Sequence, residues 1–226
     1  MRYSSLSFLF FVLICFVSCR KENSEKVNQD DIWTDYKVIY SSELDTTFAR
    51  VSFKHKDKNG ESLKLSSKSE ILINEINPDF NGIFQWYQLM IKGKKSPILF
   101  EYEDLEGNVF SNSIEVSGVA EINVNLDTIY SDSVFYLPWN GLELKDGEFV
   151  NAIFDGALDN DLTVITQDSI NTNGIYIKST SLNKLPLGDL TVHFERWNEI
   201  EVFSTSAGGQ GFGRYISKKK TVKLVD

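Results

Sequence analysis

Apolar and polar residues alternate in short runs along most of the chain, beginning near Asp35. Ala49, Val51, Phe53 and His55, for example, fall on one face of an extended strand, and the residues between them fall on the other. A period of two is typical of a half-buried β-strand. Beyond Asp35 no run of ten or more residues shows helical spacing, so the pattern predicts an all-β protein.

The alternating runs form two groups of seven predicted strands. The first group lies near residues 36–40, 48–55, 62–65, 70–76, 83–91, 98–102 and 109–116, and the second near 133–137, 149–154, 162–166, 174–178, 189–196, 200–204 and 215–225. Turn-forming stretches such as Asn77-Pro78-Asp79 separate the runs. Seven strands fill about one sandwich, so we predict two tandem antiparallel β-sandwiches, over residues 32–125 and 126–226, joined near residues 118–127.

The N-terminal segment has a different pattern. Arg2 precedes an almost continuous apolar run from Leu6 to Val17, and polar residues follow at once. The run is too short to cross comfortably a bilayer whose hydrocarbon core is about 30 Å thick. We therefore predict a secretory signal peptide over residues 1–18.

The end of the signal, Phe16-Val17-Ser18-Cys19, resembles the lipobox of bacterial lipoproteins, with Phe16 in place of the usual leucine. The resemblance implies that Cys19 is lipidated and anchors the chain to a membrane. Residues 19–31 are polar and aperiodic, so we expect a flexible tether there. Arg20-Lys21-Glu22 resembles the export signals of Bacteroidota surface lipoproteins, which implies the bacterial outer membrane and leaves open whether the chain faces the periplasm or the cell surface.

Two further stretches resemble parts of bacterial immunoglobulin-like domains. Residues 181–190 combine two leucines, a proline and a glycine before a strand, like the short helical crossover between two sheets in those domains. Residues 100–112 look like a hairpin common in envelope lipoproteins. The resemblance implies that both sandwiches are of immunoglobulin-like type, and it specifies a fold without a chemistry.

Charge and cysteine content narrow the possible partners. The chain has 23 basic and 32 acidic residues, a net charge of −9, and removing residues 1–18 takes away Arg2 and no acid. An acidic chain argues against binding to nucleic acid and to anionic lipid headgroups. The two cysteines are Cys15, in the signal, and Cys19, so the folded part has no disulfide, no zinc-thiolate site and no cysteine nucleophile.

The two histidines are the first candidates for chemistry. His55 lies among charged residues near a turn, where we expect a solvated side chain. His193 shares a strand face with Glu195 and Trp197, so a His193–Glu195 pair could bind a metal or polarise a hydroxyl; a solvated sheet face is the alternative we prefer. No GxSxG, HExxH or CxxC motif is present. We predict no catalytic residue, no metal site and no cofactor.

Three other clusters have ordinary structural interpretations. Asp155, Asp159, Asn160 and Asp161 could offer oxygen ligands to calcium, but their spacing differs from the Asp-x-Asp-x-Asp-Gly loop, so we favour a turn and leave calcium open. The glycine-rich residues 208–213 lack the Lys-Ser/Thr of a phosphate-binding loop, and we expect a wide hairpin or bulge between the last two strands. Lysines 218–220 are interpreted as protection of a sheet edge.

The four tryptophans remain as candidates for ligand stacking. We predict that Trp86 is core, because its run is apolar on both faces, and that Trp139 and Trp197 could be exposed, although covering the end of a sandwich is the commoner role of such residues. Trp33 is the fourth ring. Trp139, Trp197 and His193 are thus the candidate ligand-binding residues.

These observations favour a non-enzymatic protein. We predict a lipid-anchored binding or scaffold module of the bacterial envelope, whose partner is an envelope protein or a glycan. A surface glycan-binding lipoprotein is one alternative. An envelope hydrolase or metal-dependent enzyme, with His193 and Glu195 or the acidic loop as its site, is the other.

Overall fold

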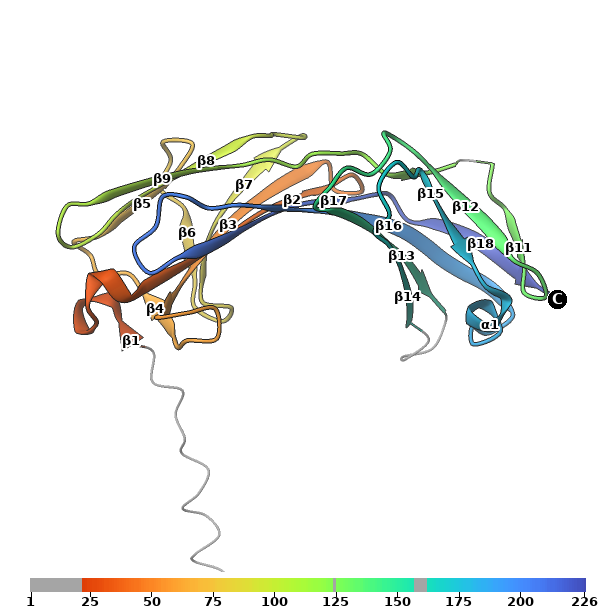
Figure 1. The fold of residues 1–226 in the computed structure, drawn as a ribbon, viewed down its shortest axis with the longest axis horizontal. Helices are drawn as coiled ribbons and strands as arrows, with labels where there is room; N and C mark the ends of the chain where they lie inside the picture. Colours follow the sequence, from red (N-terminus) through yellow and green to blue (C-terminus); the bar gives the residue numbers. More distant parts are fainter. Residues whose placement is uncertain (1–21, 124, 157–161) are drawn as a thin grey trace, which may run out of the picture.

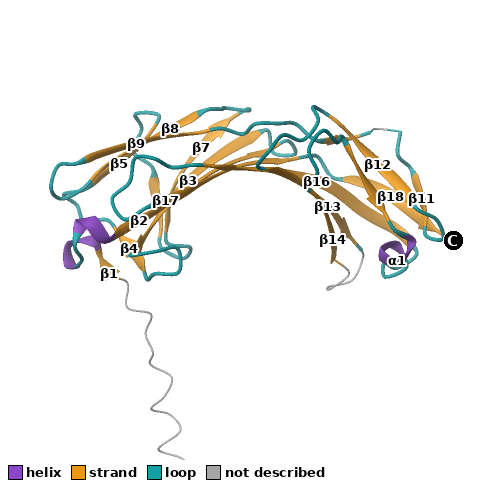
Figure 2. Ribbon diagram, in the orientation of Figure 1, coloured by secondary structure: helices purple, strands orange, loops and turns teal. Residues whose placement is uncertain are grey.

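The structure, a computed structural model, describes residues 22–123, 125–156 and 162–226. Figure 2 shows that strands dominate this part of the chain, which confirms the predicted all-β class. The strands are β1 (Glu22–Asn23), β2 (Ile32–Ser41), β3 (Thr46–His55), β4 (Ser62–Lys64), β5 (Glu70–Ile73), β6 (Asp79–Asn81), β7 (Trp86–Lys92), β8 (Ile98–Glu103), β9 (Val109–Ile114), β10 (Glu121–Ile122), β11 (Thr128–Tyr130), β12 (Phe135–Asn140), β13 (Glu148–Asp155), β14 (Leu162–Gln167), β15 (Gly174–Ile177), β16 (Gly188–Ile200), β17 (Gly209–Ile216) and β18 (Lys220–Val225). Helix α1 (Ser179–Leu182) and two 3₁₀ turns (Ser24–Lys26 and Gln29–Asp31) complete the described elements.

One twelve-stranded sheet runs the length of the molecule. Its path is β1-β4-β3-β2-β17-β16-β13-β14, with β7 and β6 beside β3, and β18 and β11 beside β16. Most neighbours are antiparallel, but β2 and β17 run parallel from Thr34 opposite Gly209 to Ser41 opposite Ile216. Figure 1 shows the result as an arch whose two halves are joined by β2, β17 and β16.

Two hydrophobic cores lie on the same side of this sheet, one in each half of the arch. A three-stranded sheet, β5-β8-β9, covers the first core, in which Phe53 and Tyr102 have ring centroids 4.7 Å apart. A second three-stranded sheet, β10-β12-β15, covers the other core, which includes Phe154 and Phe194. Each core is closed by aromatic and β-branched side chains from alternate strand positions, as the period of two predicts.

Strand β16 belongs to both halves. Its first residues, Gly188–Val192, pair with β18, and its last residues, Glu195–Ile200, pair with β17. Leu190, Val192 and Phe194 point into the second core, as their alternation predicts, and Ile200 packs against the first.

The C-terminal segment returns to the first half. Strand β17 lies between β2 and β16, and Tyr215 is buried in the first core, with its ring 5.5 Å from that of Tyr40. Residues before 120 and after 208 therefore build the same core. The two separate immunoglobulin-like sandwiches that we predicted over residues 32–125 and 126–226 stay a prediction, whereas the all-β architecture is confirmed.

The glycine-rich segment has a different role from the one predicted. Gly209 to Gly213 lie within β17, so the expected wide hairpin between the last two strands is wrong. A Cβ atom on Gly213 would lie 1.9 Å from the carbonyl oxygen of Glu115, and one on Gly211 would lie 2.6 Å from Cδ1 of Ile114. The glycines are required because the chain crosses closely over β17 as it passes from the first half to the second.

Residues 22–31 are folded against the first half, so the prediction of a flexible tether is wrong for them. Ser24 is fully buried; its hydroxyl accepts a hydrogen bond from the Ser66 amide at 2.9 Å, and its carbonyl accepts one from the Gln29 side chain at 2.9 Å. Asn23 and Asn28 accept hydrogen bonds from the first turns of the two 3₁₀ segments. The polar side chains of this segment therefore cap the two 3₁₀ turns or form buried hydrogen bonds, instead of being solvated as in a flexible tether.

Other local predictions have mixed outcomes. The hairpin over residues 100–112 is confirmed as β8 and β9, and the short helix near 181 is confirmed as α1, followed by buried Leu182 and Leu185. The strand expected at 200–204 is wrong, because β16 ends at Ile200. Strand β18 lies between β16 and β11, but β11 pairs with it only from Lys223 to Val225, so the edge-protecting role of lysines 218–220 stays a prediction.

Candidate functional site

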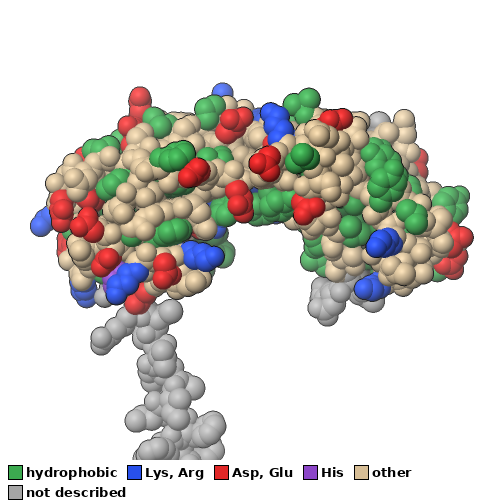
Figure 3. All heavy atoms as spheres, viewed as in Figure 1, with side chains coloured by type: hydrophobic (Ala, Val, Ile, Leu, Met, Phe, Trp, Pro, Cys, Tyr) green, Lys and Arg blue, Asp and Glu red, His purple; other side chains and the backbone are tan. Residues whose placement is uncertain are grey.

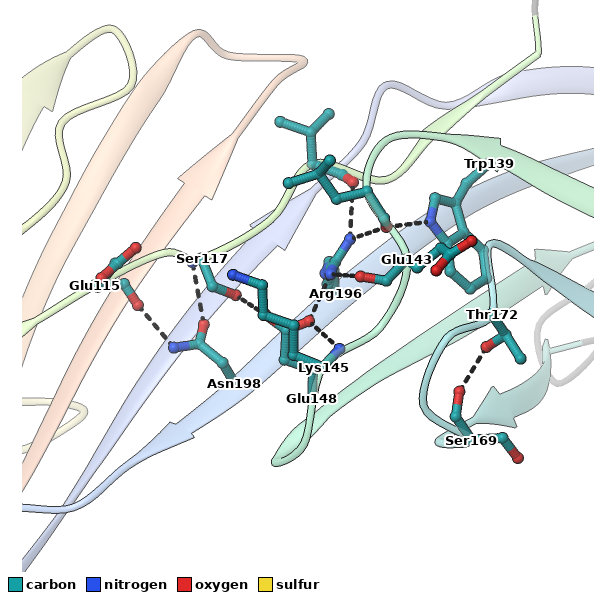
Figure 4. A network of polar contacts seen from close by, with 12 residues as sticks. Glu115, Ser117, Trp139, Glu143, Lys145, Glu148, Ser169, Thr172, Arg196 and Asn198 are labelled. Carbon is teal, nitrogen blue, oxygen red and sulfur yellow. Dashed lines mark hydrogen bonds and ion pairs between the residues drawn. The ribbon is translucent and has the colours of Figure 1, made fainter.

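A buried ion pair lies where the two cores meet (Figure 4). The guanidinium of Arg196 is 2.5 Å from Glu148, and both side chains are almost fully buried, 2% and 4% exposed. Arg196 also donates to the carbonyl oxygens of Leu142 (2.6 Å) and Glu143 (2.9 Å), and Glu148 accepts from Ser117 at 2.5 Å. Because these groups are enclosed and engaged with one another, the network holds the two halves together and offers no opening to a ligand.

The predicted His193–Glu195 pair exists, but it is not on a solvated face. His193 and Glu195 are 9% and 7% exposed, with Nε2 of His193 3.7 Å from Oε1 of Glu195. Glu195 also pairs with Arg214 and accepts a hydrogen bond from the Trp197 indole at 3.3 Å. The expectation of solvated side chains is wrong here, because both side chains are buried and Glu195 is engaged by Arg214 and Trp197.

The electrostatics of Glu195 oppose a catalytic role. Burial raises the pKa of the Glu195 carboxyl, but the neighbouring His193 side chain and the charge of Arg214 lower it by more, so its pKa lies below the ordinary value. An ionised carboxylate held by three neighbours is a poor general acid and a poorly available base. Across residues 22–123, 125–156 and 162–226, no three His, Cys, Asp or Glu side chains meet as a metal site.

Trp197 is partly exposed, but both faces of its ring are occupied. Phe149 stacks beside it with centroids 5.9 Å apart and an interplanar angle of 9°, and the Arg214 guanidinium lies 4.5 Å from its centroid. Phe212 meets it edge-on at 6.4 Å. Stacking on a ligand requires an open ring face, so Trp197 cannot act as the predicted platform without displacing Arg214 or Phe149.

Trp86 repeats this arrangement in the first half. Phe84 stacks on it at 4.6 Å and 10°, and the Arg50 guanidinium lies 4.4 Å from its centroid. The prediction that Trp86 is core is wrong, because it projects from the face of β7 opposite Tyr87, which does pack into the core. Cation–π contacts of this kind stabilise an exposed sheet face instead.

The other candidate residues are also accounted for. Trp139 is 3% exposed, and its indole donates to the carbonyl of Leu142 at 3.1 Å, so it belongs to the second core and is removed from the ligand-binding candidates. Trp33 is partly buried against Gly208. His55 is partly buried, 3.9 Å from Asp31. In the acidic loop only Asp155 is among the described residues; Asp159, Asn160 and Asp161 lie outside them.

An aromatic surface that the tryptophan analysis missed lies on the outer face of the β10-β12-β15 sheet. Tyr136 and Tyr176 are direct cross-strand partners, with ring centroids 4.7 Å apart and an interplanar angle of 40°. Tyr176 is 71% exposed, Tyr136 39%, and Val134, two residues before Tyr136, 64%. We call these three residues the tyrosine surface. Figure 3 shows hydrophobic side chains gathered over β12 and β15 in the right half of the arch.

The ring of Tyr136 lies flat on the sheet. A Cβ atom on Gly174 would lie 2.3 Å from Cζ of Tyr136, so the ring occupies the space that a side chain on β15 would fill. Its hydroxyl donates to Oδ1 of Asn173 at 3.0 Å, which fixes the orientation of the ring. The Tyr136 ring is therefore held against the backbone of Gly174, the Tyr176 ring packs on it, and Tyr176 is the more exposed of the two.

The sequence contains a signal for this surface. Tyr136 and Val134 alternate with Phe135 and Leu137, which pack against or within the second core, so the run has two apolar faces. A half-buried strand needs only one apolar face, and an apolar outer face on a covering sheet indicates a contact surface. The cross-strand pairing with Tyr176, however, depends on a register that the sequence alone does not provide.

Comparisons with known proteins assign no family. No protein-family model and no curated protein matches the sequence. Among solved structures, a tetra-tandem repeat from the extending region of a large adhesion protein matches 78% of this chain and 56% of its own, at 12% identity and a TM-score of 0.28. A structure concerned with host cell surface retention of a 1.5-MDa bacterial ice-binding adhesin matches 87% of this chain and 66% of its own, at 12% identity and a TM-score of 0.23. Similarities at this level define neither a family nor a function for the chain.

The described part of the chain contains no helix long and apolar enough to cross a membrane.

Proposed function

We propose that the protein is a non-enzymatic, lipid-anchored binding module of the bacterial envelope that captures a neutral glycan on the tyrosine surface. The membrane anchor of this proposal rests on the lipobox-like residues ending at Cys19 and on their implied lipidation. The ligand rests on a single structural observation, the pair of adjoining, outward-facing tyrosine rings on β12 and β15.

The geometry of the two rings suits a sugar. A pyranose ring presents an apolar C–H face edged by hydroxyls, and it packs on a flat aromatic ring whose outer face is open. Tyr176, which is 71% exposed, offers such a face, and Tyr136 packs against it at a 40° tilt and extends the aromatic surface. The backbone of Gly174 and the hydrogen bond to Asn173 hold Tyr136 in place before the ligand arrives, which lowers the entropic cost of binding.

The charge of the surface favours a neutral ligand. The strand segments that carry it, Phe135–Asn140 and Gly174–Ile177, contain no Asp, Glu, Lys or Arg. A stable protein–protein interface typically buries about 1,200–2,000 Å² in total, far more than two rings and a valine provide. A membrane-binding surface needs apolar side chains that project into the bilayer, whereas the ring of Tyr136 lies flat.

The glycan assignment is tested by affinity electrophoresis of residues 20–226. The gels contain neutral polysaccharides, for example a mixed-linkage β-glucan, an α-glucan, a mannan or a xylan. At least one polysaccharide should delay the wild-type protein. Tyr176→Ala and Tyr136→Ala should abolish the delay. Tyr130→Ala is the matched control, since Tyr130 is 55% exposed on β11 and lies outside the surface. Absence of delay in every gel, or a delay that survives Tyr176→Ala, would overturn the glycan assignment.

The anchor is tested separately in cells. Cys19→Ala should abolish incorporation of a labelled fatty acid, and the chain should no longer be retained by the membrane after its signal is removed. Continued membrane retention of the unlabelled variant would refute the anchor and leave the glycan site to be judged by the gels alone.

A further inference from the structure

Strand β14 ends the twelve-stranded sheet. It pairs with β13 along six residues, from Leu162 opposite Asp155 to Gln167 opposite Val150, and among the described residues no strand pairs with its other side. In an antiparallel ladder, alternate residues of an edge strand direct their N–H and C=O groups outward. The outward backbone donors and acceptors of β14 therefore have no strand partner among the described residues.

The sequence of β14 carries none of the usual protection of an edge. Leu-Thr-Val-Ile-Thr-Gln contains no charge, no proline and no glycine, and its register with β13 has no bulge. Leu162 and Val164 are 58% and 48% exposed. Soluble proteins normally block such an edge with lysine, proline, a bulge or a covering segment, because an open edge recruits further strands.

The comparable uncharged edge in the first half is covered. Strand β9, Val-Phe-Ser-Asn-Ser-Ile, also lacks charge, but the loop after β16 lies along it. The Asn112 side chain donates to the Ser204 carbonyl at 2.7 Å, and the Ser111 amide donates to the Ser204 hydroxyl at 3.1 Å. The fold therefore covers the uncharged edge of the first half with a loop, whereas β14 has no strand partner on its outer side among the described residues.

We propose that β14 is a self-association edge, which pairs antiparallel with β14 of a second copy of this chain. A second copy of the chain fits this edge, because both strands are then uncharged and equally long, and both have outward backbone groups without a strand partner. In an antiparallel pair, residues directly opposite each other point to the same face, so a two-fold axis perpendicular to the sheet must lie midway between one residue and its own copy. With the axis at Val164, Val164 lies opposite its own copy and Leu162 lies opposite Thr166.

The dimer so formed joins two arches through one continuous sheet. The contact is a single pair of six-residue strands, which is smaller than the interface of a stable dimer, so association is weak and depends on protein concentration. Its strength does not depend on ion pairs. Because the chain has a net charge of −9, added salt screens repulsion between the copies and should favour the dimer.

Cysteine crosslinking and sedimentation test this proposal on residues 20–226, which contain no cysteine. Val164→Cys should form a disulfide-linked dimer under mild oxidation, because the two thiols meet at the symmetry axis. Val109→Cys is the matched control, since Val109 is 60% exposed on the covered strand β9. In sedimentation velocity the weight-average mass of the wild type should rise with concentration and with salt, and Val164→Lys should abolish the rise.

Two outcomes would overturn the proposal. One is a wild-type protein that stays monomeric at concentrations up to about 1 mM. The other is crosslinking of Val109→Cys as fast as that of Val164→Cys, since random collision would then explain both. A wild-type dimer that Val164→Lys leaves intact would likewise assign the contact to another surface.

Discussion

Arg196 on β16 and Glu148 on β13 form an ion pair 2.5 Å long at the junction of the two cores, where neither side chain reaches solvent. Gly118 lies directly against the guanidinium, because a Cβ atom there would be 2.3 Å from Cζ of Arg196. Ser117 and the backbone of residues 142 and 143 complete the enclosure. The crossing segment, the loop before β13 and the long strand β16 thus meet at one charged pair.

Breaking this pair from one side should be costly. Arg196→Met would leave the Glu148 carboxylate buried without its partner, and we expect it to lower the free energy of unfolding by about 3–5 kcal/mol. The double variant Arg196→Met/Glu148→Leu should be more stable than Arg196→Met alone, because the unpaired charge is removed. Urea denaturation of the three proteins measures both effects, and equal stability of the single and double variants would show that the charge is not the cause.

Stability should also fall in acid through Glu148. Burial raises its pKa, but the hydrogen bond from Ser117 and the pairing with Arg196 lower it more, so the folded pKa lies below the ordinary value of 4.5. A carboxyl with a lowered folded pKa contributes stability above its unfolded pKa and loses it as the pH falls through the folded pKa. The free energy of unfolding should therefore decline below about pH 4.5, and less so in Glu148→Gln. An identical decline in Glu148→Gln would assign the acid sensitivity to other groups.

The close crossing at β17 predicts a steric cost at Gly213. Gly213→Ala would place a Cβ atom 1.9 Å from the Glu115 carbonyl, a backbone atom that cannot rotate away, and should destabilise the protein by several kcal/mol or prevent folding. Gly107→Ala is the control: its φ of +82° is unfavourable for alanine, but the space around it is open, so its cost should be only about 1–2 kcal/mol. Thermal unfolding of both variants compares them, and a Gly213→Ala protein as stable as Gly107→Ala would contradict the packing described.

The flat position of Tyr136 predicts a variant that impairs glycan binding without removing either ring. Gly174→Ala would place a methyl group within 2.3 Å of the Tyr136 ring and lift it from the sheet, breaking the continuity with Tyr176. Retardation in the polysaccharide gel should weaken while both tyrosines remain. Unchanged retardation would mean that the flat orientation of Tyr136 does not matter for binding.

How far the sequence predicts this fold depends on the range of the interactions involved. Leu190, Val192 and Phe194 were placed correctly in the core, because alternation along one strand is a local property. The parallel pairing of β17 with β2 was not predictable, since it joins residues about 175 positions apart in the chain and leaves no periodic signal. The glycines of β17 were therefore interpreted as a hairpin or bulge, although Gly211 and Gly213 make room for the crossing segment at Ile114 and Glu115.

In the candidate site, too, local properties could be predicted from the sequence, whereas contacts between distant strands could not. The sequence analysis considered only the four tryptophans as stacking rings, yet Trp139 fills the core and Trp197 is enclosed by Phe149 and Arg214. Whether a ring is open depends on its cross-strand neighbours, and these follow from register. Tyr136 and Tyr176 become a surface only because the register places them opposite each other beside Gly174.

The shared sheet also predicts that the first half cannot fold alone. A fragment of residues 22–125 lacks β17, so β2 loses its parallel partner and the first core loses Tyr215. We expect this fragment to be unfolded by circular dichroism and by the dispersion of its amide resonances. A stable, dispersed fragment would support two independent domains.

Native-state hydrogen exchange with Phe154→Ala tests the central claim, that one sheet makes both cores a single cooperative unit. Phe154 is fully buried in the second core, so the substitution should cost about 3–5 kcal/mol. If β16 and β17 couple the halves, the amides of β3 in the first half should lose as much protection as those of β13 in the second. Loss of protection confined to the second half, with β3 unchanged, would contradict the claim and show that the two cores unfold separately.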